Sequence, residues 1–318
     1  MKFKKTKNLI QSIIKHMSVD EIDVEESRQF ANLKCLDPMR LFYNVKTFKV
    51  NNEGYKIPVR LYFPKRTNSK ENWNVILYFH GGGWTTDSID SYDRICAKLS
   101  KATNHMVISV DYRLAPENKF PIGLMDCYRV AKIAHSILDP ETITIAGDSA
   151  GANLAAAVSL LCKEKQEFKP VRQILIYPVV NSDFSKSSPY PSVQENGSDY
   201  ILTVGKLQDY IDLYCAKEED KSNPYFAPIY AQDVSNQPDT LIITAELDPL
   251  KDEGKAYGQK LKEAGNYVEI HEIKRAMHGF FALGIKNFHV QESFDIINSF
   301  LDSREMNVCH KSENIGEN

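Results

Sequence analysis

The sequence predicts an α/β fold in which helices cover both faces of a largely parallel β-sheet. Short β-rich runs alternate with longer helical patterns through most of the chain, as expected when crossover helices join parallel strands. The central runs, such as VILYF at 75–79 and ILIY at 174–177, are almost entirely apolar. Strands that are buried on both faces of a parallel sheet have this composition.

Eight segments have the pattern of strands, and five have the pattern of helices. The predicted strands are Val45–Val50, Pro58–Phe63, Val75–Phe79, Met106–Asp111, Thr142–Ala146, Gln173–Tyr177, Thr240–Thr244 and Val268–Ile273. The predicted helices are Tyr92–Ala102, Pro121–Leu138, Ala150–Lys165, Asp252–Ala264 and Val290–Leu301. The short link from Asn51 to Gly54 favours a hairpin between the first two strands, so an antiparallel pair should precede the parallel part of the sheet.

Two regions fall outside this alternation. Residues 1–44 look helical and amphipathic and contain no strand, and residues 181–228 separate two strands by far more than one crossover needs. Inserts of this length often form lids or binding segments, so we expect both regions to form a cap on a domain that spans residues 45–302. The alternative is that their apolar side chains simply cover the sheet. Residues 303–318 are expected to be a frayed polar tail.

Composition narrows the class of protein. The 318 residues include 42% hydrophobic residues, enough for a buried core, and the formal net charge of −3 gives no basic excess for nucleic acid. The basic start MKFKKTK is followed by a stretch too polar for a signal peptide, and no stretch has the apolar length of a membrane span. We therefore expect a soluble cytoplasmic protein without nucleic-acid or membrane partners. The six cysteines lack metal-ligand spacing, so we expect free thiols and no metal site.

The first chemical motif is GDSAG at 147–151, a G-x-S-x-G that follows the apolar run TITIA and opens a helical run. This strand–turn–helix context is what the motif requires for a nucleophilic serine. The glycines allow a sharp turn, and Ser149 would lie at a helix N-terminus whose free N–H groups favour an anion. Asp148 could organise this turn or be merely structural. The alternative is a glycine-rich turn with an incidental serine.

The second motif is HGGGW at 80–84, directly after a predicted strand. Successive glycines let a backbone approach another group closely with its N–H groups outward. Acyl transfer needs such donors because its tetrahedral intermediate carries an oxyanion. We predict an oxyanion hole formed by the N–H groups of Gly81, Gly82 and Ala150, with His80 and Gly83 supporting the loop. A phosphate-binding loop is less favoured because neither a P-loop Lys-Ser/Thr pair nor G-x-G-x-x-G follows.

Two further motifs supply a carboxylate and a base. Asp248 in ELDPL follows a predicted strand, and His278 in MHGF follows the last one. The chain order Ser, Asp, His is that of α/β enzymes with a nucleophile elbow. His278 is predicted to take the proton of Ser149, and Asp248 to orient the imidazole. Trp84, the last residue of HGGGW, and Phe280, the last residue of MHGF, are predicted to line the substrate pocket. Weaker alternatives for the acid and the base are Asp239, Asp252 and His271.

Together these motifs resemble the hormone-sensitive-lipase-like, or H-G-G-G, family of esterases. The similarity extends from about residue 55 to 302 and rests on motifs that agree in order and spacing. They are HGGGW at 80–84, DYRLAPE at 111–117, GDSAG at 147–151, TAELDPLKDEG at 244–254 and MHGF at 277–280. The N-terminal 44 residues match no motif of this family.

The resemblance implies an α/β-hydrolase fold: a mostly parallel eight-stranded sheet flanked by helices, with a helical cap and no cofactor. It also implies hydrolysis of small carboxylic esters. With the motifs and the expected cap, we predict a serine carboxylesterase that acts on short-acyl esters through a Ser-His-Asp triad and an acyl-enzyme intermediate. A receptor-like member of the same fold that only binds its ligand is a second hypothesis, which the presence of His278 disfavours. Action on amides or thioesters, or acyl transfer, stays open. A homodimer that pairs through an exposed last strand is also possible.

Overall fold

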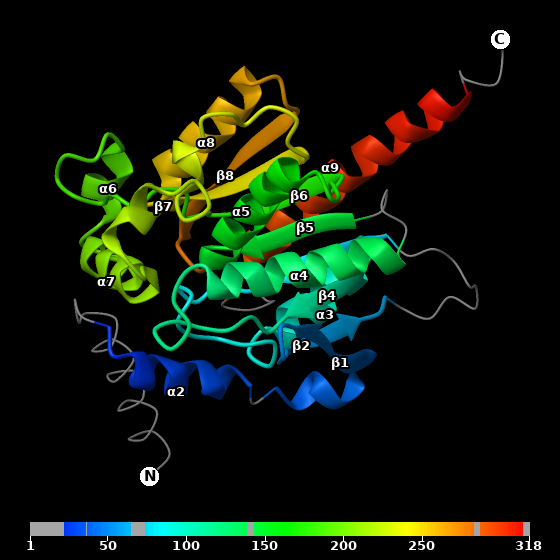
Figure 1. The fold of residues 1–318 in the computed structure, drawn as a ribbon, viewed down its shortest axis with the longest axis horizontal. Helices are drawn as coiled ribbons and strands as arrows, with labels where there is room; N and C mark the ends of the chain where they lie inside the picture. Colours follow the sequence, from blue (N-terminus) through cyan, green and yellow to red (C-terminus); the bar gives the residue numbers. More distant parts are fainter. Residues whose placement is uncertain (1–21, 36, 65–73, 139–142, 283–286, 314–318) are drawn as a thin grey trace.

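The computed structural model contains one eight-stranded sheet and describes residues 22–35, 37–64, 74–138, 143–282 and 287–313 (Figure 1). Its strands are β1 (Val45–Asn52), β2 (Tyr55–Tyr62), β3 (Val75–Phe79), β4 (Met106–Val110), β5 (Ile143–Asp148), β6 (Arg172–Ile176), β7 (Asp239–Leu247) and β8 (Val268–Met277). Their order in the sheet is β1-β2-β4-β3-β5-β6-β7-β8.

Strand directions follow the sequence-based expectation. β1 pairs antiparallel with β2, with Asn52 opposite Tyr55 at the hairpin, and β2 pairs antiparallel with β4. The other neighbouring strands pair in parallel. The predicted α/β-hydrolase fold class is therefore confirmed. Because parallel strands end at the same edge of a sheet, the segments that follow β3, β5, β7 and β8 meet at one edge.

Helices cover both faces of the sheet, as the apolar strands require. All five residues of β3 are buried, as are all five of β4. One buried cluster joins the sheet to α3 (Asp93–Thr103) and α9 (Phe288–Glu313). The other joins it to α4 (Ile122–Ile137), α5 (Ala150–Lys165) and α8 (Lys251–Glu263).

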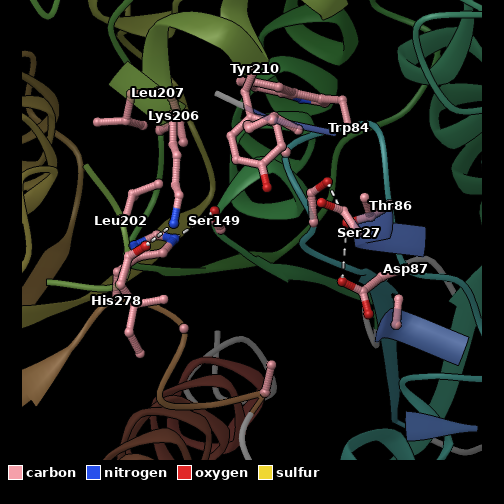
Figure 2. Close-up of a pocket in the computed structure, with 18 of the residues that line it drawn as sticks. Ser27, Trp84, Thr86, Asp87, Ser149, Leu202, Lys206, Leu207, Tyr210 and His278 are labelled. Atoms are coloured by element: carbon pink, nitrogen blue, oxygen red, sulfur yellow. Dashed lines mark hydrogen bonds between the residues drawn. The ribbon is translucent and has the colours of Figure 1, made fainter. Parts of the chain in front are cut away.

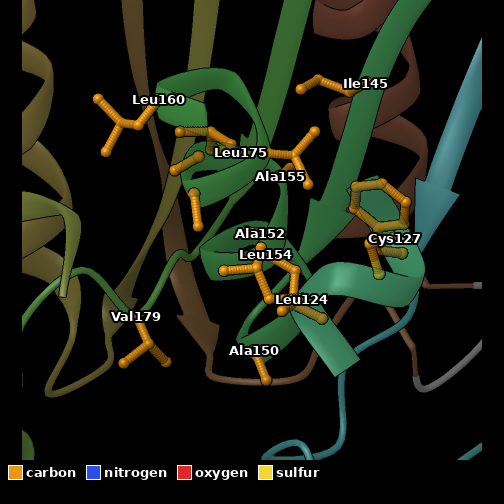
Figure 3. Packing of buried hydrophobic residues seen from close by; sticks show 14 of the residues in the cluster. Leu124, Cys127, Ile145, Ala150, Ala152, Leu154, Ala155, Leu160, Leu175 and Val179 are labelled. Carbon is orange, nitrogen blue, oxygen red and sulfur yellow. The ribbon is translucent and has the colours of Figure 1, made fainter. Parts of the chain in front are cut away.

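Helix α5 is the most deeply buried helix of the described chain. Every residue from Ala150 to Cys162 is buried, which matches a helix that is apolar on all sides. Figure 3 shows its side chains packed among Leu124 of α4 and Ile145 and Leu175 of the sheet. Small alanine side chains let the axis of α5 approach the sheet closely, so the start of α5 is fixed with respect to the strand ends.

The described parts of residues 1–44 and 181–228 lie together near one end of the sheet (Figure 1). They form α2 (Val24–Lys34), the 3-10 helix η1 (Pro38–Phe42), α6 (Pro191–Asn196), α7 (Val204–Tyr214) and η3 (Glu218–Ser222), and η4 (Pro228–Tyr230) begins at the last residue of the insert. The Ile22 N–H donates to Asp209 of α7 at 2.9 Å. Arg28 of α2 donates to the Thr85 carbonyl oxygen at 2.8 Å. Residues 1–21 of the expected cap lie outside the described residues.

The C-terminal segment corrects one expectation. The last helix was predicted to end at Leu301 and to be followed by a frayed tail from residue 303, but α9 continues to Glu313. The reason lies in the composition, because residues 303–313 contain neither glycine nor proline and include good helix formers. Residues 314–318 of the expected tail lie outside the described residues. No helix in the described part of the chain is long and apolar enough to cross a membrane.

Glu253 of α8 is a fully buried carboxyl group that anchors the start of the 181–228 insert. Its Oε1 atom accepts hydrogen bonds from the N–H groups of Val180 at 2.8 Å and Asn181 at 3.2 Å. Burial raises the pKa of Glu253 to about 8, although these two hydrogen bonds oppose the rise. The folded chain therefore keeps a proton on Glu253 at pH values where the unfolded chain has lost it.

This raised pKa predicts a pH-dependent stability. Between the ordinary carboxyl pKa of 4.5 and the folded value of about 8, the folded state binds more protons, so the free energy of unfolding falls as pH rises. Glu253→Gln cannot titrate, so its stability relative to the parent should increase from pH 5 to pH 8 by on the order of 1 kcal/mol or more. Denaturant unfolding at both pH values measures the difference, with Glu263→Gln, an exposed carboxyl on the same helix, as the control. Parallel pH profiles for parent and Glu253→Gln would show that burial does not perturb this group.

Candidate active site

Ser149 occupies a tight turn between β5 and α5. Its backbone angles, φ 54° and ψ −120°, lie outside the regions that L-residues normally adopt. A hydrogen bond of 2.9 Å from its N–H to the Ile176 carbonyl oxygen holds the turn in place. Glycine is required on either side, because a Cβ on Gly147 would lie 2.4 Å from the backbone of Gly151. Such a strained strand–turn–helix corner exposes the serine hydroxyl at the end of the strand.

The structure brings the three predicted residues Ser149, His278 and Asp248 together. His278 Nε2 lies 2.9 Å from Ser149 Oγ, and His278 Nδ1 lies 2.8 Å from Asp248 Oδ2. Asp248 is fully buried, and its other oxygen accepts the Leu250 N–H at 2.9 Å. The ring of Tyr177 packs against His278 with a centroid distance of 4.7 Å. In this arrangement a proton can pass from the hydroxyl to the imidazole while the carboxylate holds the opposite N–H.

The three weaker alternatives for the catalytic acid and base make contacts elsewhere in the fold. Asp239 begins β7 and therefore lies at the opposite end of that strand from Asp248. His271 lies within β8, with Nε2 3.2 Å from Glu269. Asp252 accepts the Ser192 N–H at 2.8 Å and so caps α6. None of these three side chains contacts Ser149 in the described structure.

The loop after β3 corrects the predicted oxyanion donors. The Gly81 N–H donates to Asp148 Oδ1 at 3.1 Å and to the Tyr92 hydroxyl at 3.1 Å, so the prediction of Gly81 as an oxyanion donor is wrong. The N–H groups of Gly82 and Gly83 have no acceptor within the described part of the chain, and both residues line the pocket beside Ser149. Three consecutive glycines show that a backbone approaches closely, but they do not show which N–H groups face the pocket.

His80 and Gly83 support the loop in the described structure. His80 is fully buried, its Nδ1 donates to the Gly81 carbonyl oxygen at 2.8 Å, and its ring stacks on Tyr112 at 4.4 Å. A Cβ on Gly83 would lie 2.2 Å from the ring of Tyr210 in α7. The loop is thus packed tightly between the sheet and the insert.

The two predicted pocket residues have different outcomes. Trp84 lines the pocket and stacks on Tyr214 with a centroid distance of 4.5 Å. Phe280 does not line it, so that prediction is wrong. Its side chain is 2% exposed and packs against Tyr177 in the core. Gly279 has φ 79°, and the Phe280 side chain after it belongs to the buried cluster that contains strand residues.

Ser149 and His278 line a pocket of about 320 Å³, and its other walls come mainly from the loop after β3, from the α2 region and from the insert. Figure 2 shows Leu202, Lys206 and Leu207 on the side of His278, and Ser27, Thr86 and Asp87 on the opposite side. Sequence reasoning did not identify these wall residues, because they belong to no motif. Within the described residues, no group of three or more His, Cys, Asp or Glu side chains could hold a metal ion.

Comparisons with known proteins identify the family of this chain. A family model described as the alpha/beta hydrolase fold matches residues 76–282, a range that contains Ser149, Asp248 and His278. An arylesterase of Saccharolobus solfataricus is 35% identical to this chain over 285 residues, which cover 86% of this chain and 90% of that protein. An ethyl acetate hydrolase of Pseudomonas putida is 34% identical over 73% of this chain and 74% of its own length.

A solved structure extends the similarity to three dimensions. The hyperthermophilic esterase of the archaeon Pyrobaculum calidifontis matches with a TM-score of 0.81 and 31% sequence identity, covering 93% of this chain and 98% of that chain. The matched 93% of this chain is built on the eight-stranded sheet that carries the Ser149 turn. The chain therefore belongs to the hormone-sensitive-lipase-like esterases of the α/β-hydrolase fold.

Proposed function

We propose that this protein is a serine carboxylesterase that hydrolyses small, short-acyl esters through an acyl-enzyme intermediate. The observation that carries the proposal is the continuous hydrogen-bonded path from Ser149 Oγ through the His278 ring to Asp248, with distances of 2.9 and 2.8 Å. This path ends in a pocket large enough for a small ester. The curated relatives named as an arylesterase and an ethyl acetate hydrolase support the choice of ester as substrate.

In the first half of the proposed reaction, Ser149 Oγ attacks the ester carbonyl carbon and its proton passes to His278 Nε2. Asp248 stabilises the resulting imidazolium and keeps its Nδ1–H oriented. The carbonyl oxygen becomes an oxyanion, and we expect the N–H groups of Gly82, Gly83 and Ala150 to bind it. Ala150 contributes because it is the first residue of α5, where the N–H groups have no helical acceptor.

The intermediate then collapses. The bond from carbon to the alcohol oxygen breaks, His278 returns its proton to the leaving alcohol, and the acyl group stays on Ser149. A water molecule replaces the alcohol, loses a proton to His278 and attacks the acyl carbon. The second intermediate releases the carboxylic acid, and His278 returns the proton to Ser149 Oγ.

The pocket supports a preference for short acyl groups. Its volume of about 320 Å³ is at the lower end for ligand sites. Leu202, Leu207 and Ile211 of the insert line it, and α2 closes another side with Phe30 and Ala31. We propose that these two segments form a cap that excludes water and limits acyl length.

Removing the nucleophile should abolish turnover. Ser149→Ala and His278→Ala should each lower kcat by roughly a millionfold or to background, because the two side chains act as one unit. Asp248→Asn should cost less, about ten-thousandfold. Initial rates with p-nitrophenyl butyrate measure all three, and Ser136→Ala, an exposed serine on α4, is the matched control. Retention of parental turnover by Ser149→Ala would refute the nucleophile.

Acyl length should affect the rate through the cap. Across p-nitrophenyl esters from acetate to decanoate, kcat/KM should be highest up to hexanoate and then fall by about tenfold or more. Leu207→Ala should reduce this fall because it removes apolar bulk from the pocket wall. Leu41→Ala is the control, because Leu41 is 91% exposed and does not line the pocket. A rate that rises through decanoate in the parent would contradict the proposed limit, and faster cleavage of a matched anilide or thioester would change the substrate class.

A further inference from the structure

Asp148 precedes the proposed nucleophile, and its carboxylate is almost completely buried. Four donors surround its two oxygens. The Tyr78 hydroxyl and the Gly81 N–H donate to Oδ1 at 2.8 and 3.1 Å. The Tyr92 and Tyr177 hydroxyls donate to Oδ2 at 2.9 and 3.2 Å. None of the proton transfers proposed above uses this group.

Burying a carboxylate is costly unless hydrogen bonds compensate it, and an apolar side chain would fill the same space without that cost. Burial raises the pKa of Asp148, and the hydroxyls of Tyr78 and Tyr92 oppose that rise. Four donors directed at two oxygens match the acceptor capacity of an ionised carboxylate. Asp148 is costly to bury, and all of its hydrogen-bonding capacity is used. We therefore look for a role of this carboxylate beyond filling space.

The hydrogen-bond partners of Asp148 belong to different parts of the proposed active site. Gly81 begins the loop that presents the N–H groups of Gly82 and Gly83. Tyr92 lies at the start of α3, and its hydroxyl also accepts the Gly81 N–H at 3.1 Å. Tyr177 follows β6, and its ring packs against the His278 ring at 4.7 Å. The Asp148 carboxylate thus contacts the glycine loop and Tyr177, which packs against His278. Asp148 itself belongs to the turn that holds Ser149.

The contact between Asp148 and the loop is as close as the backbone allows. A Cβ on Gly81 would lie 2.7 Å from Asp148 Oδ2 and 3.0 Å from the Asp148 carbonyl oxygen. The glycine therefore rests directly on the residue that precedes Ser149. This contact therefore fixes the distance between the glycine loop and Ser149.

We propose that Asp148 is a positioning residue that fixes the oxyanion donors of the glycine loop relative to Ser149. It acts through the Gly81 N–H and, through Tyr177, also fixes the orientation of His278. The proposal rests on the esterase function proposed above. Asp148 touches no reacting atom, so its loss should affect the transition state more than substrate binding. A misplacement of about 1 Å can reduce a catalysed rate by roughly a hundredfold.

The direct test is Asp148→Asn, which keeps the shape of the side chain. We expect kcat for p-nitrophenyl butyrate to fall by about a hundredfold while KM changes by less than about threefold. Affinity for a trifluoromethyl ketone, which forms an oxyanion adduct with an active serine, should fall in parallel with kcat. If Asp148→Asn keeps parental kcat and parental affinity for this ketone, the proposal is wrong.

A matched pair of tyrosine variants distinguishes an effect on the position of the glycine loop from an effect on the stability of the fold. The pair also tests the proposal if Asp148→Asn does not fold. Tyr92→Phe removes a donor to Asp148 and an acceptor of the Gly81 N–H. Tyr62→Phe removes a buried tyrosine bond to Asp93, another buried carboxylate, in a different part of the fold. Both should lower the melting temperature. Only Tyr92→Phe should lower kcat and ketone affinity, by about tenfold, because it alone alters the loop.

Two outcomes have different meanings. If Tyr92→Phe and Tyr62→Phe change kcat equally for equal losses of stability, the carboxylate supports only the fold and the positioning role is refuted. If the parent does not hydrolyse the ester, or if Ser149→Ala is as active as the parent in the same assay, the proposed function itself fails. Parent and Ser149→Ala are therefore measured beside the tyrosine variants.

Discussion

The start of helix α5 packs against the end of strand β3 at a distance that only glycine permits. A Cβ on Gly151 would lie 2.1 Å from the Phe79 carbonyl oxygen and 2.5 Å from that of His80. This contact joins the serine turn to the glycine loop. The Ser149 hydroxyl, the Ala150 N–H and the loop therefore lie close together at the carboxyl ends of the strands. The alanine-rich interior of α5 keeps the helix in that position.

The proposed cap is held in place by contacts with the loop after β3. α2 is attached to the loop after β3 through Arg28, which bonds the Thr85 carbonyl oxygen and pairs with Glu117 at 2.7 Å. The ring of Tyr210 in α7 packs directly over Gly83. The same loop therefore contacts the sheet on one side and α2 and α7 on the other, and these contacts connect the pocket walls to the proposed oxyanion donors.

The sequence predicted features that depend on local pattern or on a motif. All eight strands, the hairpin and the meeting of Ser149, Asp248 and His278 follow from apolar runs, glycine spacing and chain order. Features that depend on orientation were missed. Gly81 was assigned as a donor because the pattern does not reveal which N–H points to Asp148, and Phe280 was placed in the pocket because the turn at Gly279 was not foreseen. The lengths of segments 1–44 and 181–228 indicated a cap, but which of their side chains line the pocket depends on tertiary packing, for which the sequence contains no local signal.

The central claim is that the Ser149 hydroxyl is the nucleophile of this site. Its most direct test is covalent trapping with an organophosphate, followed by peptide mass spectrometry of the inactivated protein. The expected result is complete loss of esterase activity with one adduct per chain, located on Ser149, and no adduct in the Ser149→Ala variant. A stoichiometric adduct on another residue that accompanies the loss of activity would contradict the account.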